Sequence, residues 1–477
     1  MSKKTISSMM LPNKVQLDGY NADLESQQVR VDSEILYPIT SSNTGTNDFL
    51  KFVIQNKGIL SNKSKIQFCF TTGTTYSGSM VYYPLLTGGL SVIKSARLQI
   101  GNRTIATSGR YNQFFATQRG FVRDCKRLGI DQVTNLTNDT YEIVSNGTTG
   151  AINKGVGVYN GSVDVDGTIQ DVVFNPWSAV GDSSSSSPTF SVTIEELFPF
   201  LSGNLDIPLY LLKPNEQVVI YIELENDTMV GNRVVVDAGN SQSRELTLMD
   251  MTSTKMLIDY VYFNQDRMTE IENAYKSNGD MVEYMDLQLV EQSLPDMANN
   301  TLTQDTIILT GTNRVCKGLF CSIQEDYGVE KNYKKSVMGD YFSSNYDKKR
   351  GFNLTINNQQ LLVGSARDQT EAEQYYYYST WNNNMPLYIP KALYGNADKM
   401  TTNIVNGLSN TTLKGKNSPF GIAFGESGYA INSVPIKMNL ARQHNGGGTL
   451  SNNRLFVWCA IRRVFSINPN GSVSVSF

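Results

Sequence analysis

Histidine is nearly missing from this chain of 477 residues, which limits the chemistry that its side chains could perform. The single histidine, His444, lies in the polar, glycine-rich run ARQHNGGG. A Ser-His-Asp or Cys-His arrangement would have to use this residue, and a zinc site made of several histidines could not form. We interpret His444 as a solvated loop residue and predict no catalytic residues of this kind.

The cysteines do not indicate a metal site. Cys69, Cys125, Cys316, Cys321 and Cys459 are odd in number and scattered, which argues against a disulfide framework. Cys316 and Cys321 have no second cysteine pair to complete a zinc site. We interpret Cys316 and Cys321 as small apolar residues in strands, and we predict no metal and no cofactor.

Two adjacent carboxylates, Glu195 and Glu196, raise the question of glycoside hydrolysis, which needs a pair of acids. Neighbouring side chains on a strand point to opposite faces, and the first turn of a helix favours acidic residues. We therefore do not interpret the pair as catalytic, whether it lies on a strand or at a helix start. No glycine-rich segment matches a P-loop or a dinucleotide fingerprint, so the sequence predicts no enzyme.

Tyrosine clusters and net charge give little sign of nucleic-acid binding. Residues 325–350 mix tyrosines with six basic and five acidic residues, as a solvated loop would. The run Tyr375–Tyr378 is typical of packing at a domain or subunit surface. The whole chain has 41 basic and 44 acidic residues and a net charge of -3. We predict no direct sequence-specific nucleic-acid binding.

The elements that would position these side chains are mainly strands, because the chain is rich in β-branched and aromatic residues separated by polar turns. The segment 217–225 alternates apolar and polar residues, as a half-buried strand does. Its expected core face carries Val218, Ile220, Ile222 and Leu224.

A short pattern occurs in both halves of the chain. RLQIGNRTI aligns Leu98 and Ile100 with Leu354 and Ile356 of NLTINNQQL, each pair preceding a predicted two-residue turn. We predict amphipathic hairpins at both places and an ancient duplication that relates the two halves.

The chain divides into segments of different character. Residues 1–45 lack periodicity and predict an extended N-terminal arm, and residues 265–278 predict a polar, helix-compatible connector between two domains. The polar segment 131–188 predicts long surface excursions with short strands of their own. The start of the chain does not resemble a signal peptide, and no apolar run is long enough to span a membrane, so we expect synthesis in the cytoplasm without secretion.

Four segments together resemble double jelly-roll major capsid proteins, the shell proteins of polinton-like viruses, virophages and nucleocytoplasmic large DNA viruses. They are IEELFPFLSGNLDIPLYLL (194–212), MLIDYVYFNQDRMTEIEN (256–273), FGESGYAINSVPIKMNL (424–440) and CAIRRVFSINPNGSVSVSF (459–477). They cover about a quarter of the chain and occur in the family's order. The chain is more similar to the smaller polinton-like and virophage proteins.

The resemblance implies an all-β fold of two eight-stranded jelly rolls with long surface loops, the first over 46–264 and the second over 279–477. It also implies a homotrimer whose six jelly rolls form a pseudo-hexameric capsomer that tiles the icosahedral shell of a double-stranded DNA virus. The implied location is the virion capsid. The implied partners are other copies of the chain, penton and minor capsid proteins, and an internal membrane. On this interpretation the loops 131–188 and 325–350 form outward towers, and the arm runs underneath.

The same resemblance assigns an architectural role to the proline- and aromatic-rich segment 194–225. Phe198, Pro199 and Phe200 would form a compact corner, while Pro208 and Pro214 would bound a short connection before a strand. Proline suits positions where a strand ladder must stop, and aromatic rings fill the space beneath a corner.

A carbohydrate-binding β-sandwich, of the fibre or lectin-like kind, is the alternative. It would explain the abundance of Asn, Tyr and Gly but not the four ordered segments. A sugar site also needs convergent aromatic residues, and the chain has three tryptophans, Trp177, Trp381 and Trp458.

Overall fold

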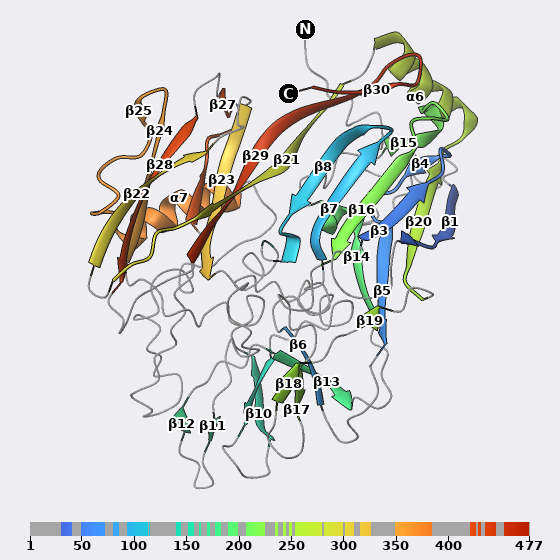
Figure 1. Ribbon diagram of the computed structural model, residues 1–477. Helices are drawn as coiled ribbons and strands as arrows, with labels where there is room; N and C mark the ends of the chain where they lie inside the picture. The colour runs from blue at the N-terminus through green and yellow to red at the C-terminus, as the bar shows by residue number, and fades with distance from the viewer. Residues whose placement is uncertain are drawn as a thin grey trace.

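Two β-sandwiches lie side by side in the computed structural model, with a group of short strands at one end of the pair (Figure 1). The structure describes residues 30–40, 49–71, 80–84, 93–112, 114, 140–144, 151–156, 162–163, 169–171, 177–182, 189–198, 207–224, 234–236, 242–244, 248–249, 253–278, 281–298, 301–309, 315–325, 349–383, 420–425, 428–430, 435–444 and 453–476.

The first sandwich has two antiparallel sheets. One follows the order β14-β5-β20-β4-β15, with β1 paired to β20 and β19 paired to β5, and the other follows β2-β3-β16-β7-β8. Its strands are β1 (Arg30–Leu36), β2 (Ile39–Thr40), β3 (Phe49–Ile54), β4 (Ile59–Leu60), β5 (Lys65–Thr71), β7 (Ile93–Ile100), β8 (Arg103–Gly109), β14 (Thr189–Thr193), β15 (Ile207–Pro208), β16 (Val218–Leu224), β19 (Leu248–Met249) and β20 (Lys255–Tyr262).

The core of the first sandwich forms where the inward faces of alternating strands meet. On β16, Val218, Ile220 and Ile222 are fully buried and Leu224 is partly buried, which confirms the predicted face. β16 pairs with β3 on one side and β7 on the other, so this face lies in the middle of its sheet.

The second sandwich also has two antiparallel sheets. One follows β21-β29-β23-β26, with β27 paired to β23 and β30 to β29, and the other follows β22-β28-β24-β25. Its strands are β21 (Met281–Ser293), β22 (Thr301–Leu309), β23 (Val315–Glu325), β24 (Lys349–Ile356), β25 (Gln359–Gln360), β26 (Phe420–Ala423), β27 (Tyr429–Ala430), β28 (Ile436–His444), β29 (Asn453–Ile467) and β30 (Val473–Ser476).

Both sandwiches use the same order of eight strands. The neighbours β1-β20-β5-β14 and β3-β16-β7-β8 in the first correspond to β21-β29-β23-β26 and β22-β28-β24-β25 in the second. Eight antiparallel strands in two packed sheets form a jelly roll. The prediction of an all-β double jelly roll is therefore confirmed.

The hairpins β7–β8 and β24–β25 hold the same place in this order, as the repeated sequence pattern predicted. Their two-residue turns differ. Gly101 has a positive φ of 57° as the first turn residue, whereas Asn357 and Asn358 both have positive φ, at 52° and 62°. The first turn has the φ pattern of type II′ and the second that of type I′, and glycine and asparagine suit these conformations.

Part of the expected arm belongs to the first sandwich. β1 pairs with β20 from Arg30 opposite Tyr262 to Leu36 opposite Met256, and β2 pairs with β3. These strands were missed because β1 is an edge strand whose sequence, RVDSEIL, alternates poorly. Residues 1–29 lie outside the described part of the chain.

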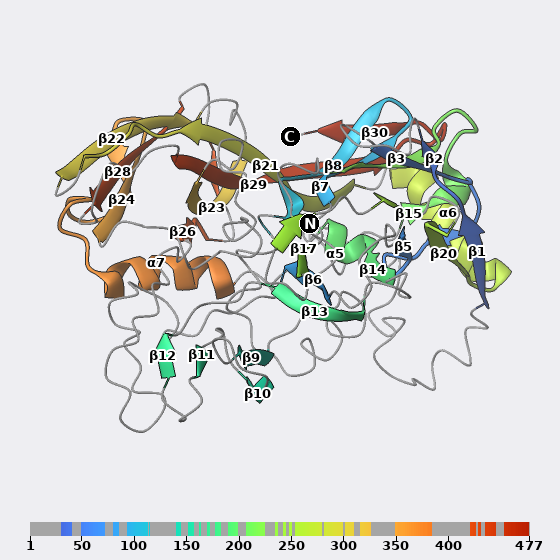
Figure 2. The ribbon, with the colours of Figure 1, turned by 60° about the horizontal axis from the view of Figure 1, so that its bottom comes forward.

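The helices are short and lie at the edges of the sandwiches. They are α5 (Ile194–Leu197), the 3₁₀ helix η3 (Leu209–Leu211), α6 (Gln265–Asn278) and α7 (Glu371–Asn383). The helical connector predicted over 265–278 is α6, and η3 lies between the two prolines that were expected to bound a connection. α7 packs on β26 and β23, along the underside of the second sandwich in Figure 2.

Short strands in the insertions of the first sandwich gather at one end of the molecule (Figure 1). β6, β13, β17 and β18 form a four-stranded sheet in the order β13-β6-β17-β18, and β9–β10 and β11–β12 form pairs. The predicted strands within 131–188 are thereby confirmed. The strands are β6 (Met80–Pro84), β9 (Thr140–Val144), β10 (Ala151–Val156), β11 (Ser162–Val163), β12 (Ile169–Asp171), β13 (Trp177–Asp182), β17 (Val234–Val236) and β18 (Gln242–Arg244).

Candidate functional site

The residues first considered for chemistry do not come together. His444 is the last residue of β28 and pairs with Thr301, so it ends a strand instead of lying in a loop as predicted. Glu195 and Glu196 lie far from it in α5 of the first sandwich. Among the described residues, no group of three or more His, Cys, Asp or Glu side chains could hold a metal ion.

Glu195 and Glu196 have structural partners. Glu196 forms a capping box with Thr193: each backbone N–H donates to the other side chain, at 3.0 and 3.1 Å. Glu195 forms an ion pair with Lys63 at 2.5 Å. Of the two arrangements considered, the structure has the helix start, where the capping box satisfies N–H groups that the first helical turn leaves without backbone partners.

Three cysteines lie in the core of the second sandwich. Cys316 and Cys321 on β23 and Cys459 on β29 are fully buried and have free thiols. Burial raises the pKa of the Cys316 thiol to about 12, so it stays protonated and unreactive near neutral pH. The interpretation as apolar strand residues is confirmed for Cys316 and Cys321, and Cys459 has the same environment.

The tyrosine run lies on α7, a helix that was not predicted from the sequence. Tyr378 is fully buried with its ring centroid 6.2 Å from that of Phe320, whereas Tyr376 is 66% exposed. The missed signal was the pair Thr370 and Glu373, whose side chains and backbone N–H groups form a capping box. The predicted loop over 325–350 lies mostly outside the described residues.

A buried polar cluster joins the two sandwiches. The Asp286 carboxylate on β21, 2% exposed, accepts from the Thr107 N–H at 2.8 Å and pairs with Arg463 at 3.0 Å. Arg463 also donates to the backbone oxygens of Thr104 and Ile105, at 3.1 and 3.3 Å. Burial raises the pKa of Asp286 above its ordinary value, although Arg463 opposes this shift. Side chains of the second sandwich thus form hydrogen bonds with backbone groups of β8, which belongs to the first sandwich.

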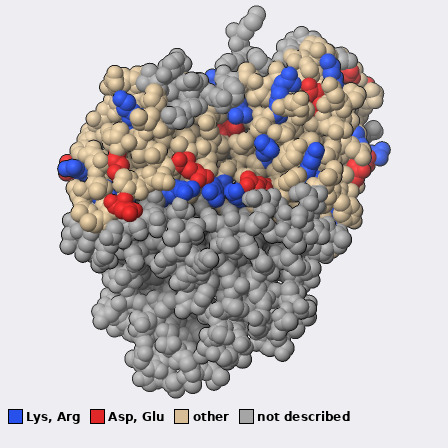
Figure 3. Space-filling model, viewed as in Figure 1, with Lys and Arg blue, Asp and Glu red and all other residues tan. Residues whose placement is uncertain are grey.

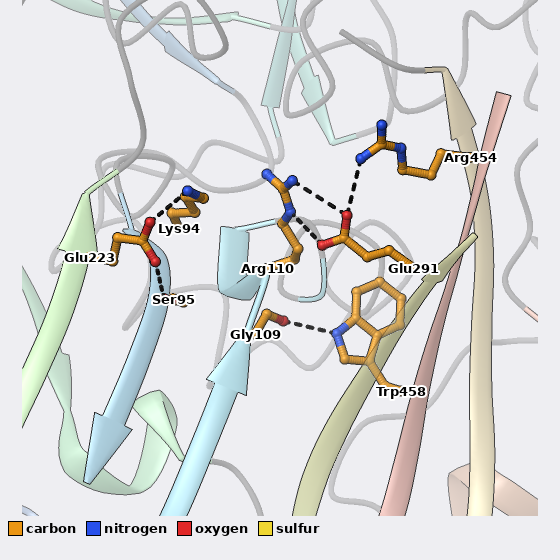
Figure 4. Close-up of polar contacts among 8 residues, drawn as sticks. All are labelled: Lys94, Ser95, Gly109, Arg110, Glu223, Glu291, Arg454 and Trp458. Carbon is orange, nitrogen blue, oxygen red and sulfur yellow. Dashed lines mark hydrogen bonds and ion pairs between the residues drawn. The ribbon is translucent and has the colours of Figure 1, made fainter. Parts of the chain in front are cut away.

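A second polar cluster lies at the other end of this junction (Figure 4). Arg110, directly after β8, donates to both Glu291 oxygens at 2.8 and 3.4 Å, and Arg454 donates to the same carboxylate at 3.2 Å. The indole N–H of Trp458 donates to the Gly109 oxygen at 3.0 Å. Burial raises the pKa of Glu291, but the two arginines outweigh it and hold the pKa below its ordinary value.

The two sandwiches also pack closely at the junction, through Gly109 and a group of aromatic rings. A Cβ on Gly109 would lie 3.1 Å from the Leu289 Cβ. The ring of Phe114, just beyond β8, lies 5.4 Å from that of Trp458 and 5.5 Å from that of Phe320. The two sandwiches therefore contact through complementary polar and aromatic groups and not through a linker alone.

A neighbouring ion pair lies within the first sandwich (Figure 4). Glu223 accepts from Lys94 at 2.6 Å and from Ser95 at 2.8 Å. In Figure 3, basic and acidic side chains are interspersed over the described part of this face, and neither sign covers a large area. Lys94 therefore neutralises the charge of Glu223.

β1 and β22 lie at opposite ends of the molecule (Figures 1 and 2), and exposed apolar side chains lie on or next to these strands. We call β1, β2 and the start of β3 the β1 flank, and β22 the β22 flank. Among the described residues, β1 pairs only with β20 and β22 only with β28. Their exposed large apolar residues are Val31, Ile35, Tyr37, Ile39 and Phe49 on the β1 flank, and Leu302 and Ile308 on the β22 flank.

No family model matches the sequence, and no curated protein matches it. No helix in the described part of the chain is long and apolar enough to cross a membrane.

Several solved structures of viral capsid proteins are similar to this chain. The cryo-EM structure of the Sputnik virophage matches with a TM-score of 0.58 and 12% identity, over 94% of this chain and 89% of that chain. PBCV-1 VP54, fitted into a reconstruction of Sputnik, matches with a TM-score of 0.55 and 12% identity, over 94% and 97%. The mavirus major capsid protein matches with a TM-score of 0.52 and 10% identity, over 97% and 92%. The chain has the double jelly-roll fold of viral major capsid proteins.

Proposed function

We propose that this protein is the major capsid protein of a double-stranded DNA virus. The observation that carries the proposal is the repeated jelly roll: two sandwiches with one strand order, joined by a close polar and aromatic junction. Such a pair is a rigid building block with two similar outer walls. The likeness to capsid proteins over nearly the whole of both chains supports this role.

The capsomer is a homotrimer on this proposal. Three chains bring six jelly rolls around a three-fold axis, so their outline is nearly hexagonal and can tile a flat facet. The β1 flank of one copy packs on the β22 flank of the next, a head-to-tail contact that closes after three copies. Both flanks expose apolar side chains on strand edges, which is the kind of surface that oligomers cover.

We assign the parts of the chain as follows. The first jelly roll runs from Arg30 to residue 264, α6 connects, and the second runs over 279–477, with residues 1–29 as the arm. The small sheet β13-β6-β17-β18 supports an outward tower, because three separate insertions of one sandwich build it at a single end.

The role is structural and not enzymatic. The subunit is made in the host cytoplasm, is not secreted, and becomes part of the virion capsid. Its partners are neighbouring capsomers, penton and minor capsid proteins, and an internal membrane below the shell. The balanced charge of the chain favours these partners over direct sequence-specific binding of DNA.

The test is the molar mass of the purified protein by size-exclusion chromatography with light scattering, followed by negative-stain images of the same peak. We expect three times the 53.0 kDa of one chain, and hexagonal outlines. A monomer that forms no such particles and binds glycans on an array would contradict the proposal and favour the carbohydrate-binding alternative.

A further inference from the structure

The last residues of the chain complete the core that its first half builds. β29 is long enough to serve both sandwiches: Leu455 and Ile461 lie in the second core, whereas Phe465 and Ile467 lie in the first. After the final turn, Val473 of β30 also lies in the first core. The three side chains contributed to the first core are at most 1% exposed.

Polar contacts hold this segment against the first sandwich. Arg463 reaches the backbone of β8 through its bonds to Thr104 and Ile105, and it is paired with the buried Asp286. The Tyr284 hydroxyl on β21 donates to the same Ile105 oxygen at 2.5 Å. β8 therefore accepts hydrogen bonds from β21 and from β29, the two strands that extend out of the second sandwich.

The turn between β29 and β30 is fitted to a loop of the first sandwich. The Lys213 N–H donates to the Gly471 oxygen at 3.0 Å. Gly471 has a φ of 77°, and a Cβ there would lie 2.8 Å from the Leu211 oxygen. Only glycine combines this backbone conformation with so close an approach.

The order of these segments along the chain has a consequence for folding. The sheets of the first sandwich are complete at Tyr262, yet Phe465, Ile467 and Val473 of its core follow only after the whole second sandwich. During synthesis the first sandwich therefore exists without three buried apolar side chains. An interior missing such groups is left with unfilled space and exposed apolar surface.

We propose that residues 463–476 act as a closing clamp on the first sandwich, which reaches its native state only after these residues have left the ribosome. The clamp makes the sandwich that is synthesised first depend on strands that are synthesised after most of the second sandwich. Chains truncated before residue 463 then lack a closed first sandwich. This inference concerns folding and does not depend on the proposed capsid role.

Cell-free translation of the full chain tests the order of events. Ribosomes are stalled either directly after Phe477, with the clamp inside the exit tunnel, or after a long Gly/Ser extension that brings the clamp outside. We expect thermolysin to cleave the first sandwich about tenfold more slowly when the extension is present. Equal cleavage rates in the two stalled chains would overturn the proposal.

A matched pair of variants in the released chain tests the contact itself. Ile467→Ala and Ile461→Ala remove the same atoms from one strand, at positions that are both 1% exposed but lie in different cores. We expect Ile467→Ala to raise amide hydrogen exchange in β16 and β7 about tenfold while β24 and β28 change little, and Ile461→Ala to do the reverse. If either alanine variant does not fold, Ile467→Val and Ile461→Val carry the same comparison. Exchange that rises equally in both cores for both variants would contradict the clamp.

Discussion

At the scale of single residues, the junction depends on a charge pair that water barely reaches. Asp286 and Arg463 belong to the second sandwich but bond to backbone groups of β8 in the first. Taking two charges out of water is costly, so such a pair adds little net stability by itself. It makes the docking of the two sandwiches specific, since any other relative position would deprive both charged groups of their hydrogen bonds to β8.

Removing one charge of this pair should be strongly destabilising. Asp286→Asn keeps an oxygen that can accept from Thr107 but leaves Arg463 charged and without its counter-ion. We expect the free energy of unfolding to fall by about 3–5 kcal/mol, measured by urea denaturation. The control is Glu270→Gln, which breaks the exposed pair with Arg267 and should have a much smaller effect. Similar losses in the two variants would argue against a special role for the buried pair.

Acid should weaken the junction through Glu291. Its pKa is lowered in the folded state, so its stabilisation is present above the unfolded pKa of Glu, about 4.3, and is lost as pH falls through the lower folded value. We expect the stability of the wild type to decrease more steeply with acidification than that of Glu291→Gln. The measurement is urea unfolding at a series of pH values from neutral to the onset of acid unfolding. Parallel pH profiles would show that the contacts of Arg110 and Arg454 with this carboxylate contribute nothing.

At the scale of elements, the two corresponding hairpins reverse the chain in two residues but use different turn types. β7–β8 turns at Gly101 and Asn102, and β24–β25 turns at Asn357 and Asn358. The positive φ at Gly101 is open to glycine without strain, whereas asparagine tolerates it within a type I′ turn. Turn type is therefore not shared between the repeats, although the two-residue length of the turn is.

Substitutions in the two turns should have unequal effects. Gly101→Ala places a Cβ on a residue at φ 57° and should cost about 1–3 kcal/mol of stability. Asn358→Gly needs no change of backbone and should alter stability by less than about 0.5 kcal/mol. Thermal unfolding of the two variants beside the wild type measures the difference. A neutral Gly101→Ala would show that the hairpin readily adopts another turn.

At the scale of the whole molecule, function on our proposal lies in the flanks and not in a pocket. The β1 flank and the β22 flank are edge strands at opposite ends, so each copy offers one of each kind (Figure 1). An exposed apolar strand edge risks indiscriminate pairing unless a partner covers it.

A lysine in either flank should dissociate the trimer without unfolding the chain. Ile35 and Ile308 are each 49% exposed, so Ile35→Lys or Ile308→Lys should shift the mass toward that of one chain and leave the melting temperature of the isolated subunit nearly unchanged. Val363→Lys is the control, since Val363 is 86% exposed and lies on neither flank. Light scattering gives the molar mass of each of the three variants and shows whether the trimer has dissociated. If both flank variants remain trimers, the interface between copies lies outside the two flanks.

Sequence alone determined the features that depend on neighbouring residues. The alternation on β16, the β7–β8 hairpin, the capped start of α5 and the helical connector α6 all follow from local periodicity, turn residues and capping pairs. The same local patterns could have predicted α7 from Thr370 and Glu373. The scarcity of histidine by itself also left few arrangements open for an active site.

Tertiary structure decided which sheet each strand joins and where the two sandwiches meet. β1 is a strand because β20, more than two hundred residues later, pairs with it. Asp286 and Thr107 are 179 positions apart, and the clamp joins the end of the chain to the core of its first half. Local patterns carry no record of such separations, because burial and charge pairing between distant segments arise only when the sheets pack.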